Sequence, residues 1–308
     1  MLRIAVESDA LDEARAVLGS ADVLAHQGSL RPWLEWVATR LQALDPPSIR
    51  AAMDRFEQRS TREPRVIGPV GVIDLCGPIV YRPSWLSQLC GAVALADVAL
   101  QLDAALRDPR VEAIVLRCDS PGGSVEMVPE VADLIWAVRR QKPVFAVADS
   151  LVASAAYWLA SQATRIYATP SARLGSIGVY LEHLEYGGAL ARQGIGVTLI
   201  SYGAHKTDGH PYGPLPAAVR ARMQARVDEL GAEFDAAVAR GRGVSVATVR
   251  RSFGGGDVFR GHEAIRRGLA DQAQTFDRVL GSFVAAPRRR PGGGAAAAAT
   301  LAFLLASE

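Results

Sequence analysis

From residue 68 onward, short apolar segments rich in β-branched residues alternate with segments of helical periodicity. Apolar segments such as "GPVGVIDLCGPIV" (68–80) and "VEAIVLRCD" (111–119) are bounded by Gly, Pro or charged residues, as buried strands are. Between them, "LADVALQLDAALRD" (95–108) has apolar residues three and four positions apart, as an amphipathic helix does. This alternation predicts an α/β fold in which helices cover a mainly parallel sheet.

The same pattern predicts further elements along the chain. Strands are expected at 143–149, 165–170 and 196–203, and helices at 128–141, 152–164, 183–194, 214–243, 245–253 and 261–270.

The two ends of the chain differ from this middle part. Residues 1–66 have helical periodicity, broken by "DPP" at 45–47, and we expect an accessory helical segment there. Residues 286–308 begin with "APRRRPGGGAAAAA", a low-complexity sequence that predicts a disordered tail. The α/β domain is therefore expected over 67–285.

Composition argues against several classes of protein. The net charge of +2 over 308 residues gives no strong field for nucleic acid or an acidic membrane. No apolar run reaches the ~18 residues that span a bilayer, and the N-terminus has no long apolar secretory segment. Neither the three cysteines nor the histidines His26, His210 and His262 have metal-ligand spacing. We expect a cytoplasmic protein without metal or cofactor.

The stretch "DSPGGSV" (119–125) joins a predicted strand to a predicted helix. A Pro-Gly-Gly sequence there predicts a sharp turn whose backbone N–H groups can bind a phosphate or an oxyanion. The alternative is an ordinary tight turn. It is neither a P-loop nor a dinucleotide-binding fingerprint.

The stretch "SLVASAAYW" (150–158) places Ser154 at a strand-to-helix transition. A serine there has its hydroxyl near free N–H groups and the positive end of a helix. The small side chains of Ala153, Ala155 and Ala156 allow another backbone to approach. The alternative is a helix with a small packing face in the core.

The stretch "SYGAHKTDGH" (201–210) contains Lys206, which with Lys142 is one of only two lysines among 34 basic residues. Unlike arginine, a lysine can lose its proton, and it acts as a base where burial favours the neutral amine. The alternative is a solvated surface lysine.

Taken together, these stretches resemble the signal peptide peptidase A (protease IV) family of serine peptidases. "DSPGGSV", "ASAAYW", "RIYATPSARLGSIGV" and "YGAHKTD" occur in the family's order and spacing. The stretch "GVIDLCGPIV…ALRDPRVEAIVLRCDSPGGSV" looks most like the phage branch, the lambda-type capsid assembly proteases. The resemblance covers about 68–280.

This resemblance implies a Clp-protease/crotonase-like fold with a Ser/Lys dyad. Ser154 matches the nucleophile, Lys206 the general base, and Ser176 a serine that hydrogen-bonds the lysine. Gly123 and the N–H of Ala155 match the two oxyanion donors. No metal or nucleotide is implied.

The phage branch further implies an endopeptidase of head maturation, which cuts scaffold or portal protein and, as a further candidate, itself. Relatives form rings in which neighbouring subunits help to build the site, so we expect a homo-oligomer within the assembling procapsid. Two departures favour the phage branch: alanines follow Ser154 where many cellular relatives have glycines, and we expect no membrane anchor. Thr207 stands where some relatives have Asp.

Other interpretations remain open. A Clp-type Ser-His-Asp peptidase would use His183 and Asp228 with Ser154. A crotonase-like enzyme would hold a thioester oxyanion of an acyl-CoA at the turn glycines. A host enzyme of the cytoplasm would degrade signal-peptide remnants, and an inactive subunit would serve head assembly alone.

Overall fold

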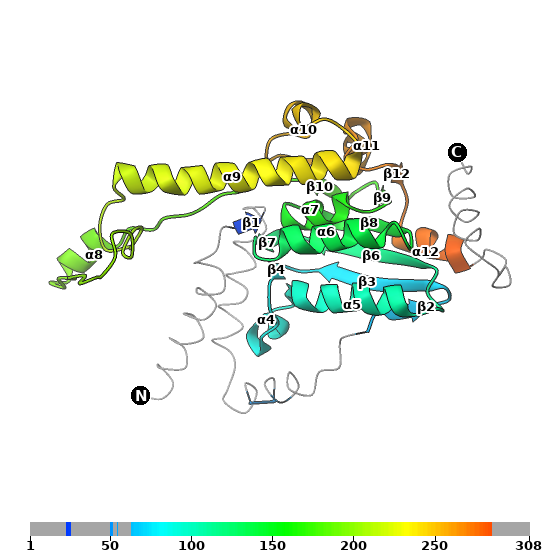
Figure 1. Cartoon of the computed structure of the whole chain (residues 1–308), viewed down its shortest axis with the longest axis horizontal. Helices are drawn as coiled ribbons and strands as arrows, with labels where there is room; N and C mark the ends of the chain where they lie inside the picture. Colours follow the sequence, from blue (N-terminus) through cyan, green and yellow to red (C-terminus); the bar gives the residue numbers. More distant parts are fainter. Residues whose placement is uncertain (1–22, 26–49, 52–53, 55–62, 285–308) are drawn as a thin grey trace.

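The structure is a computed structural model, and it describes residues 23–25, 50–51, 54 and 63–284 (Figure 1). Most of the predicted accessory segment (1–66) and the whole predicted tail (286–308) lie outside these residues.

A mixed, mostly parallel sheet forms the centre of the protein. Its strand order is β11-β10-β8-β6-β3-β2, with β9 paired to β8 and β12 to β9. Only β2 with β3 and β10 with β11 pair antiparallel among these strands. The strands are β2 (Arg65–Ile67), β3 (Val70–Cys76), β6 (Ala113–Ser120), β8 (Val144–Ala153), β9 (Arg165–Ala168), β10 (Arg173–Gly175), β11 (Val258–Arg260) and β12 (Gln272–Ala273). The predicted α/β class with a mainly parallel sheet is confirmed.

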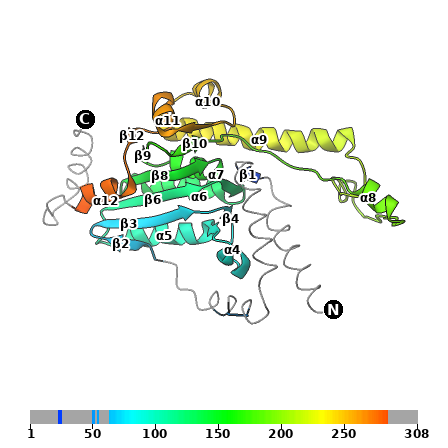
Figure 2. The ribbon, with the colours of Figure 1, turned by 180° about the vertical axis from the view of Figure 1, so that it is seen from behind.

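Both faces of this sheet are covered. Along β6, Ile114 and Leu116 face one apolar cluster while Ala113 and Val115 face another, because successive strand residues point to opposite faces. Helices α5, α6 and α7 lie over the first face and α12 over the second (Figures 1 and 2). Burial on both faces explains why the strands are continuous apolar runs. The helices are α4 (Trp85–Leu89), α5 (Leu95–Arg107), α6 (Val128–Val138), α7 (Ala155–Ser161), α8 (Gly187–Arg192), α9 (Ala217–Arg242), α10 (Val246–Ser252), α11 (Gly261–Arg267) and α12 (Phe276–Val284).

A second, small sheet carries the Gly-Gly turn. Its order is β1-β7-β4-β5, so that β7 has β4 on one edge and β1 on the other. The pairing of β7 is parallel with β4 and antiparallel with β1. The strands are β1 (Val23–Ala25), β4 (Ile79–Val80), β5 (Val93–Ala94) and β7 (Gly122–Ser124).

A long arm, which we define as residues 180–216, projects from the body between β10 and α9. Figures 1 and 2 show α8 and the start of α9 far from the sheet, at the outer end of this projection. The strand predicted at 196–203 is wrong: this segment is irregular and exposed, and Ile200 and Tyr202 are 95% and 100% accessible. A run of β-branched residues forms a strand only where it can pair with the edge of another strand. In the described part of one chain, no strand edge lies beside residues 196–203.

Two other predicted boundaries shift. The predicted strand at 68–80 is two strands, β3 and β4, separated by a turn at Gly77 with a φ of 97°. The predicted helix at 152–164 begins only at Ala155, because β8 continues to Ala153. Among the described residues, no helix is both long and apolar enough to cross a membrane.

Candidate active site

Ser154 occupies the sharp turn between β8 and α7. Its backbone has φ 55° and ψ −121°, a conformation that costs a non-glycine residue on the order of 1–3 kcal/mol. Two hydrogen bonds hold it: the Ser154 N–H donates to the carbonyl oxygen of Gly175 (2.9 Å), and the Trp158 N–H donates to the carbonyl oxygen of Ser154 (2.9 Å). Strain of this kind persists where the surroundings enforce it, and it is concentrated at functional sites.

The hydroxyl of Ser154 is buried without a hydrogen-bond partner among the described residues. The residue is 1% exposed, and α7, which follows it, is buried throughout. Leaving a buried hydroxyl unsatisfied costs roughly 1–3 kcal/mol. A serine that served only as a small packing residue would need neither the strained turn nor the unpaired hydroxyl.

Gly123 lies on β7, and α7 packs against this strand. A Cβ at Gly123 would clash with the carbonyl oxygen of Ile79 on β4, so only glycine fits. The turn before it is held by Ser120, whose Oγ accepts a hydrogen bond from the N–H of Gly122 (3.1 Å). Ala155 is the first residue of α7, where backbone N–H groups have no partner within the helix.

Ser176 adjoins Ser154 through the pairing of β10 with β8. Gly175, which precedes it, pairs with Ala153 and accepts the N–H of Ser154. Ser176 is buried, has a φ of 54°, and donates its N–H to the carbonyl oxygen of Asp257 (2.7 Å). The structure therefore brings Ser154 and Ser176 together from positions 22 residues apart in the sequence.

Lys206 is not brought to Ser154 within one chain. It is exposed on the arm, where its backbone N–H donates to the carbonyl oxygen of Gly203 (3.3 Å). His183 also lies on the arm and contacts the carbonyl oxygen of His210 through Nε2 (3.2 Å), while Asp228 on α9 accepts a hydrogen bond from Gln224 (2.7 Å). Neither the predicted dyad nor the alternative triad is assembled in a single copy.

Two polar residues of the site were not singled out in the sequence. Asp119 Oδ1 accepts the N–H of Leu151 (3.1 Å), at the irregularity where β6 and β8 change register. Ser120 holds the Gly-Gly turn as described. The sequence feature that could have identified them is their position in "DSPGG", because Asp and Ser side chains commonly accept hydrogen bonds from backbone N–H groups in turns.

A groove of about 490 Å³ begins next to Ser176, a volume within the range of ligand pockets, ~300–1,000 Å³. It runs between the segment after β10 and the helices α9 and α10, and its lining includes Ile177, Val179, Val227, Asp228, Asp235 and Val249. It can take up apolar side chains next to Ser176.

Cys76 and Cys118 are poor competing nucleophiles. Burial raises the pKa of Cys76 to about 11 and that of Cys118 well above its ordinary value. Since the thiolate is the reactive form, both side chains stay protonated and unreactive near neutral pH.

Comparisons with known proteins identify a family and several relatives. The family described as Peptidase family S49 matches residues 137–285. The head-tail preconnector protein GP5 of Enterobacteria phage P21 is 37% identical over 231 residues, which are 74% of this chain and 46% of that protein. The capsid assembly protease C of Escherichia phage lambda is 40% identical over 214 residues, 70% of this chain and 48% of that protein. The chain thus spans about half the length of these two relatives.

Two further comparisons cover a cellular protease and a solved structure. Protease 4 of Salmonella typhi is 42% identical over 91 residues, 29% of this chain and 15% of that protein. Among solved structures, a mutant of ClpP1 from Listeria monocytogenes is similar with a TM-score of 0.43 and 15% identity, over 68% of this chain and 94% of that chain. The resemblance found in the sequence motifs is confirmed by the family match and the phage relatives, and the chain belongs to peptidase family S49.

Proposed function

We propose that the protein is a serine endopeptidase in which Ser154 is the nucleophile and Lys206 the general base. One observation carries this proposal: the hydroxyl of Ser154 is buried, unpaired among the described residues, and held on a strained turn. A serine hydroxyl is a weak nucleophile until a base removes its proton. The base is therefore the second requirement of the mechanism.

In the proposed reaction, each residue of the site has one role. Lys206 takes the proton from Ser154 Oγ as that oxygen attacks the scissile carbonyl carbon, and then gives the proton to the leaving amine. The N–H groups of Gly123 and Ala155 stabilise the oxyanion, and the loss of one such donor typically costs ~10²–10³ in rate. Water then hydrolyses the acyl-enzyme and frees Ser154. Ser176 orients the amine of Lys206.

A second copy of the chain would supply Lys206. The arm that carries this lysine exposes an unusual set of large apolar side chains: Leu184, Tyr186, Ile195, Val197, Leu199, Ile200, Tyr202 and Tyr212. Exposed apolar surface of this extent marks an interaction site. Docking of the arm onto a neighbour would bury it and remove Lys206 from water, which favours the neutral amine that accepts a proton. We therefore propose a homo-oligomer with shared sites.

The substrate is proposed to be a head protein of a phage or prophage, either scaffold or portal. This follows from two relatives, one named a capsid assembly protease and the other a head-tail preconnector protein. Cleavage would take place in the cytoplasm, inside the assembling procapsid.

The protein itself is the second proposed substrate. An extended peptide can bind by adding a strand to a sheet edge. The edge of β7 opposite β4 offers this position beside Gly123, and it holds β1 with Leu24 paired to Gly123. β1 thus lies where a cleavable peptide would lie.

The test compares the purified protein with Ser154→Ala and Lys206→Ala. A biotinylated fluorophosphonate should label only the wild type, at Ser154, and only the wild type should lose a terminal segment in intact-mass measurements. Lys142→Ala, which changes the only other lysine, is the matched control and should label like the wild type. Labelling of Ser154→Ala, or wild-type labelling of Lys206→Ala, would contradict the assignment. A wild type that is not labelled would favour an inactive assembly subunit.

A further inference from the structure

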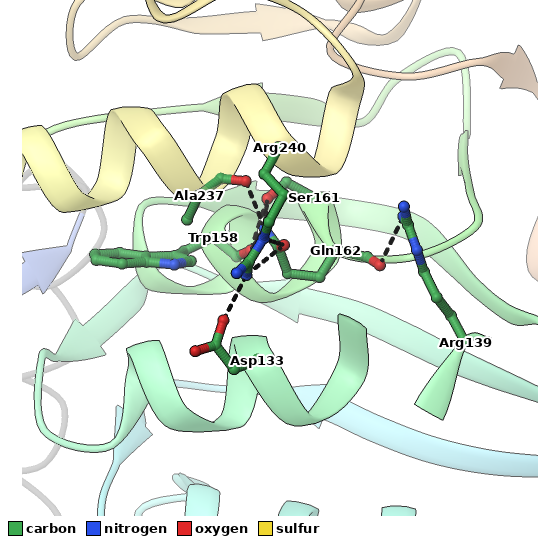
Figure 3. A network of polar contacts seen from close by, with 7 residues as sticks. All are labelled: Asp133, Arg139, Trp158, Ser161, Gln162, Ala237 and Arg240. Carbon is green, nitrogen blue, oxygen red and sulfur yellow. Dashed lines mark hydrogen bonds and ion pairs between the residues drawn. The ribbon is translucent and has the colours of Figure 1, made fainter. Parts of the chain in front are cut away.

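Gln162 lies one residue past the end of α7, and its side chain joins α7 to α9 (Figure 3). Its amide nitrogen donates to the carbonyl oxygens of Trp158 (3.2 Å) and Ala237 (3.0 Å), and to Ser161 Oγ (2.7 Å). Its amide oxygen accepts two hydrogen bonds from Arg240 (3.2 and 3.0 Å). The residue is fully buried, so both ends of this amide are satisfied inside the protein.

Arg240 extends this network to α6. Its Nη2 forms an ion pair with Asp133 (2.6 Å), and its guanidinium carbon lies 5.2 Å from the centroid of the Trp136 ring. Figure 3 shows Arg240 descending from α9 between Gln162 and Asp133. We call Gln162, Arg240 and Asp133 the clamp.

Apolar packing brings the helices together at the same place. Trp158 on α7 stacks on Phe234 of α9 with ring centroids 4.5 Å apart and an interplanar angle of 10°. A Cβ at Gly241 would clash with the carbonyl oxygen of Ser161, so α9 approaches the end of α7 as closely as a glycine allows. Stacked and apolar surfaces can slide or rotate, whereas the directed hydrogen bonds of the clamp select one orientation.

The position of the clamp along the chain links two parts of the site. The seven residues of α7 separate it from Ser154. On the other side, α9 runs back from Ala237 to Ala217, about 30 Å at the rise of an α-helix, and there it meets the arm that carries Lys206. A rotation of about 5° at the clamp would move the start of α9 by about 3 Å over this length. A misplacement of about 1 Å can cost a reaction ~10²-fold.

We propose that Gln162, through Arg240 and Asp133, is a positioning residue that sets the direction of α9 and so places the Lys206 arm for catalysis. This inference rests on the proposed function, in which Lys206 on the arm is the base. Gln162 does not touch the reacting atoms. It acts through α9, in the subunit that supplies the lysine.

The first test measures the rate of fluorophosphonate labelling in Gln162→Leu and Arg240→Met. In Gln162→Leu, the amide is replaced by an apolar side chain of similar size. Arg240 is exposed, so we expect Arg240→Met to fold and to test the inference even if Gln162→Leu does not fold. We expect labelling to slow at least about tenfold in each. The matched control is Lys142→Met, which removes a half-buried cation bonded to the carbonyl oxygens of Ala105 and Asp108 (2.9 and 2.7 Å), away from α9. It should lower the melting temperature and leave the labelling rate unchanged.

A mixing experiment separates positioning of the arm from support of Ser154. Lys206→Ala supplies the serine, and Ser154→Ala supplies the lysine. Gln162→Leu is added to one partner at a time. We expect labelling of the mixture to slow when Gln162→Leu is in the partner that supplies Lys206, and to stay unchanged when it is in the partner that supplies Ser154. A defect that follows only the partner that supplies Ser154, or wild-type labelling by folded Gln162→Leu and Arg240→Met, overturns the inference. Failure of the proposed function is distinct, because Lys206→Ala alone would then label normally.

Discussion

Ser154 and Ser176 are two non-glycine residues with positive φ, 55° and 54°, and they meet across one hydrogen bond from Ser154 N–H to the carbonyl oxygen of Gly175. The only other such residue in the described part of the chain is Met127, just after β7. Backbone strain is therefore concentrated around the Gly-Gly turn and the two serines. Each position is held by neighbouring backbone, so Ser154, the proposed nucleophile, is fixed in place before any substrate arrives.

Ser154→Ala is expected to stabilise the protein while it abolishes labelling. The variant removes a buried hydroxyl that has no partner in the described structure, so the free energy of unfolding should rise by about 1 kcal/mol. Ser154→Gly should add to this, because glycine relieves the strain of a positive φ. Thermal denaturation measures both effects. A lower melting temperature for Ser154→Ala would show that the hydroxyl is satisfied in solution.

Gly123→Ala is expected to lose at least ~10²-fold in labelling rate, because β7 must move to accommodate the new methyl group and the proposed oxyanion donor, the N–H of Gly123, moves with it. The steric cause is the clash with the carbonyl oxygen of Ile79. Gly281→Ala is the control: it lies on α12, a Cβ there would meet nothing within 4 Å, and Ala in a helix is favoured by about 1 kcal/mol. Labelling rates and melting temperatures of the two variants should diverge. Normal labelling of Gly123→Ala would remove this residue from the site.

Mixing Ser154→Ala with Lys206→Ala is expected to restore labelling, although we expect neither variant to be labelled alone. If each site takes its serine from one copy and its lysine from the next around a ring, an equal mixture restores about a quarter of the wild-type sites. The counterpart mixture of Ser154→Ala with the double variant Ser154→Ala/Lys206→Ala should stay inactive. No recovery after subunit exchange would place both residues in one copy and contradict the shared site.

Removal of β1 is expected to make the site more accessible. This strand occupies the edge of β7 next to Gly123, and an extended substrate would need the same edge. A chain that begins at residue 26 should cleave fluorescein-labelled casein with a KM several-fold lower and an unchanged kcat. Leu24→Pro, which removes a backbone N–H from the strand, should act in the same direction. An unchanged KM in both would mean that β1 does not compete with substrate.

Much of the fold was predictable because its signals are local. The apolar runs that became β3, β6 and β8 report burial on both faces, and the Pro-Gly-Gly turn and the small residues around Ser154 report tight backbone approach. The run at 196–203 has the same local signal as these strands but has no neighbouring edge in the described part of one chain, so it forms no strand. Local pattern indicates what a segment can become, and only its surroundings decide whether it does so.

The sequence by itself determined the α/β class, the strand-to-helix turn at Ser154, the family, and the candidate residues Gly123, Ala155, Ser176 and Lys206. Only the tertiary structure decided that Ser154 and Ser176 adjoin, that the Ser154 hydroxyl is unpaired among the described residues, and that Lys206 stands exposed on the arm. The physical reason is the distance along the chain over which each kind of interaction acts. Periodicity and turn chemistry act over a few residues, whereas the bond from Ser154 to Gly175 and the clamp from Gln162 to Arg240 join positions 21 and 78 residues apart.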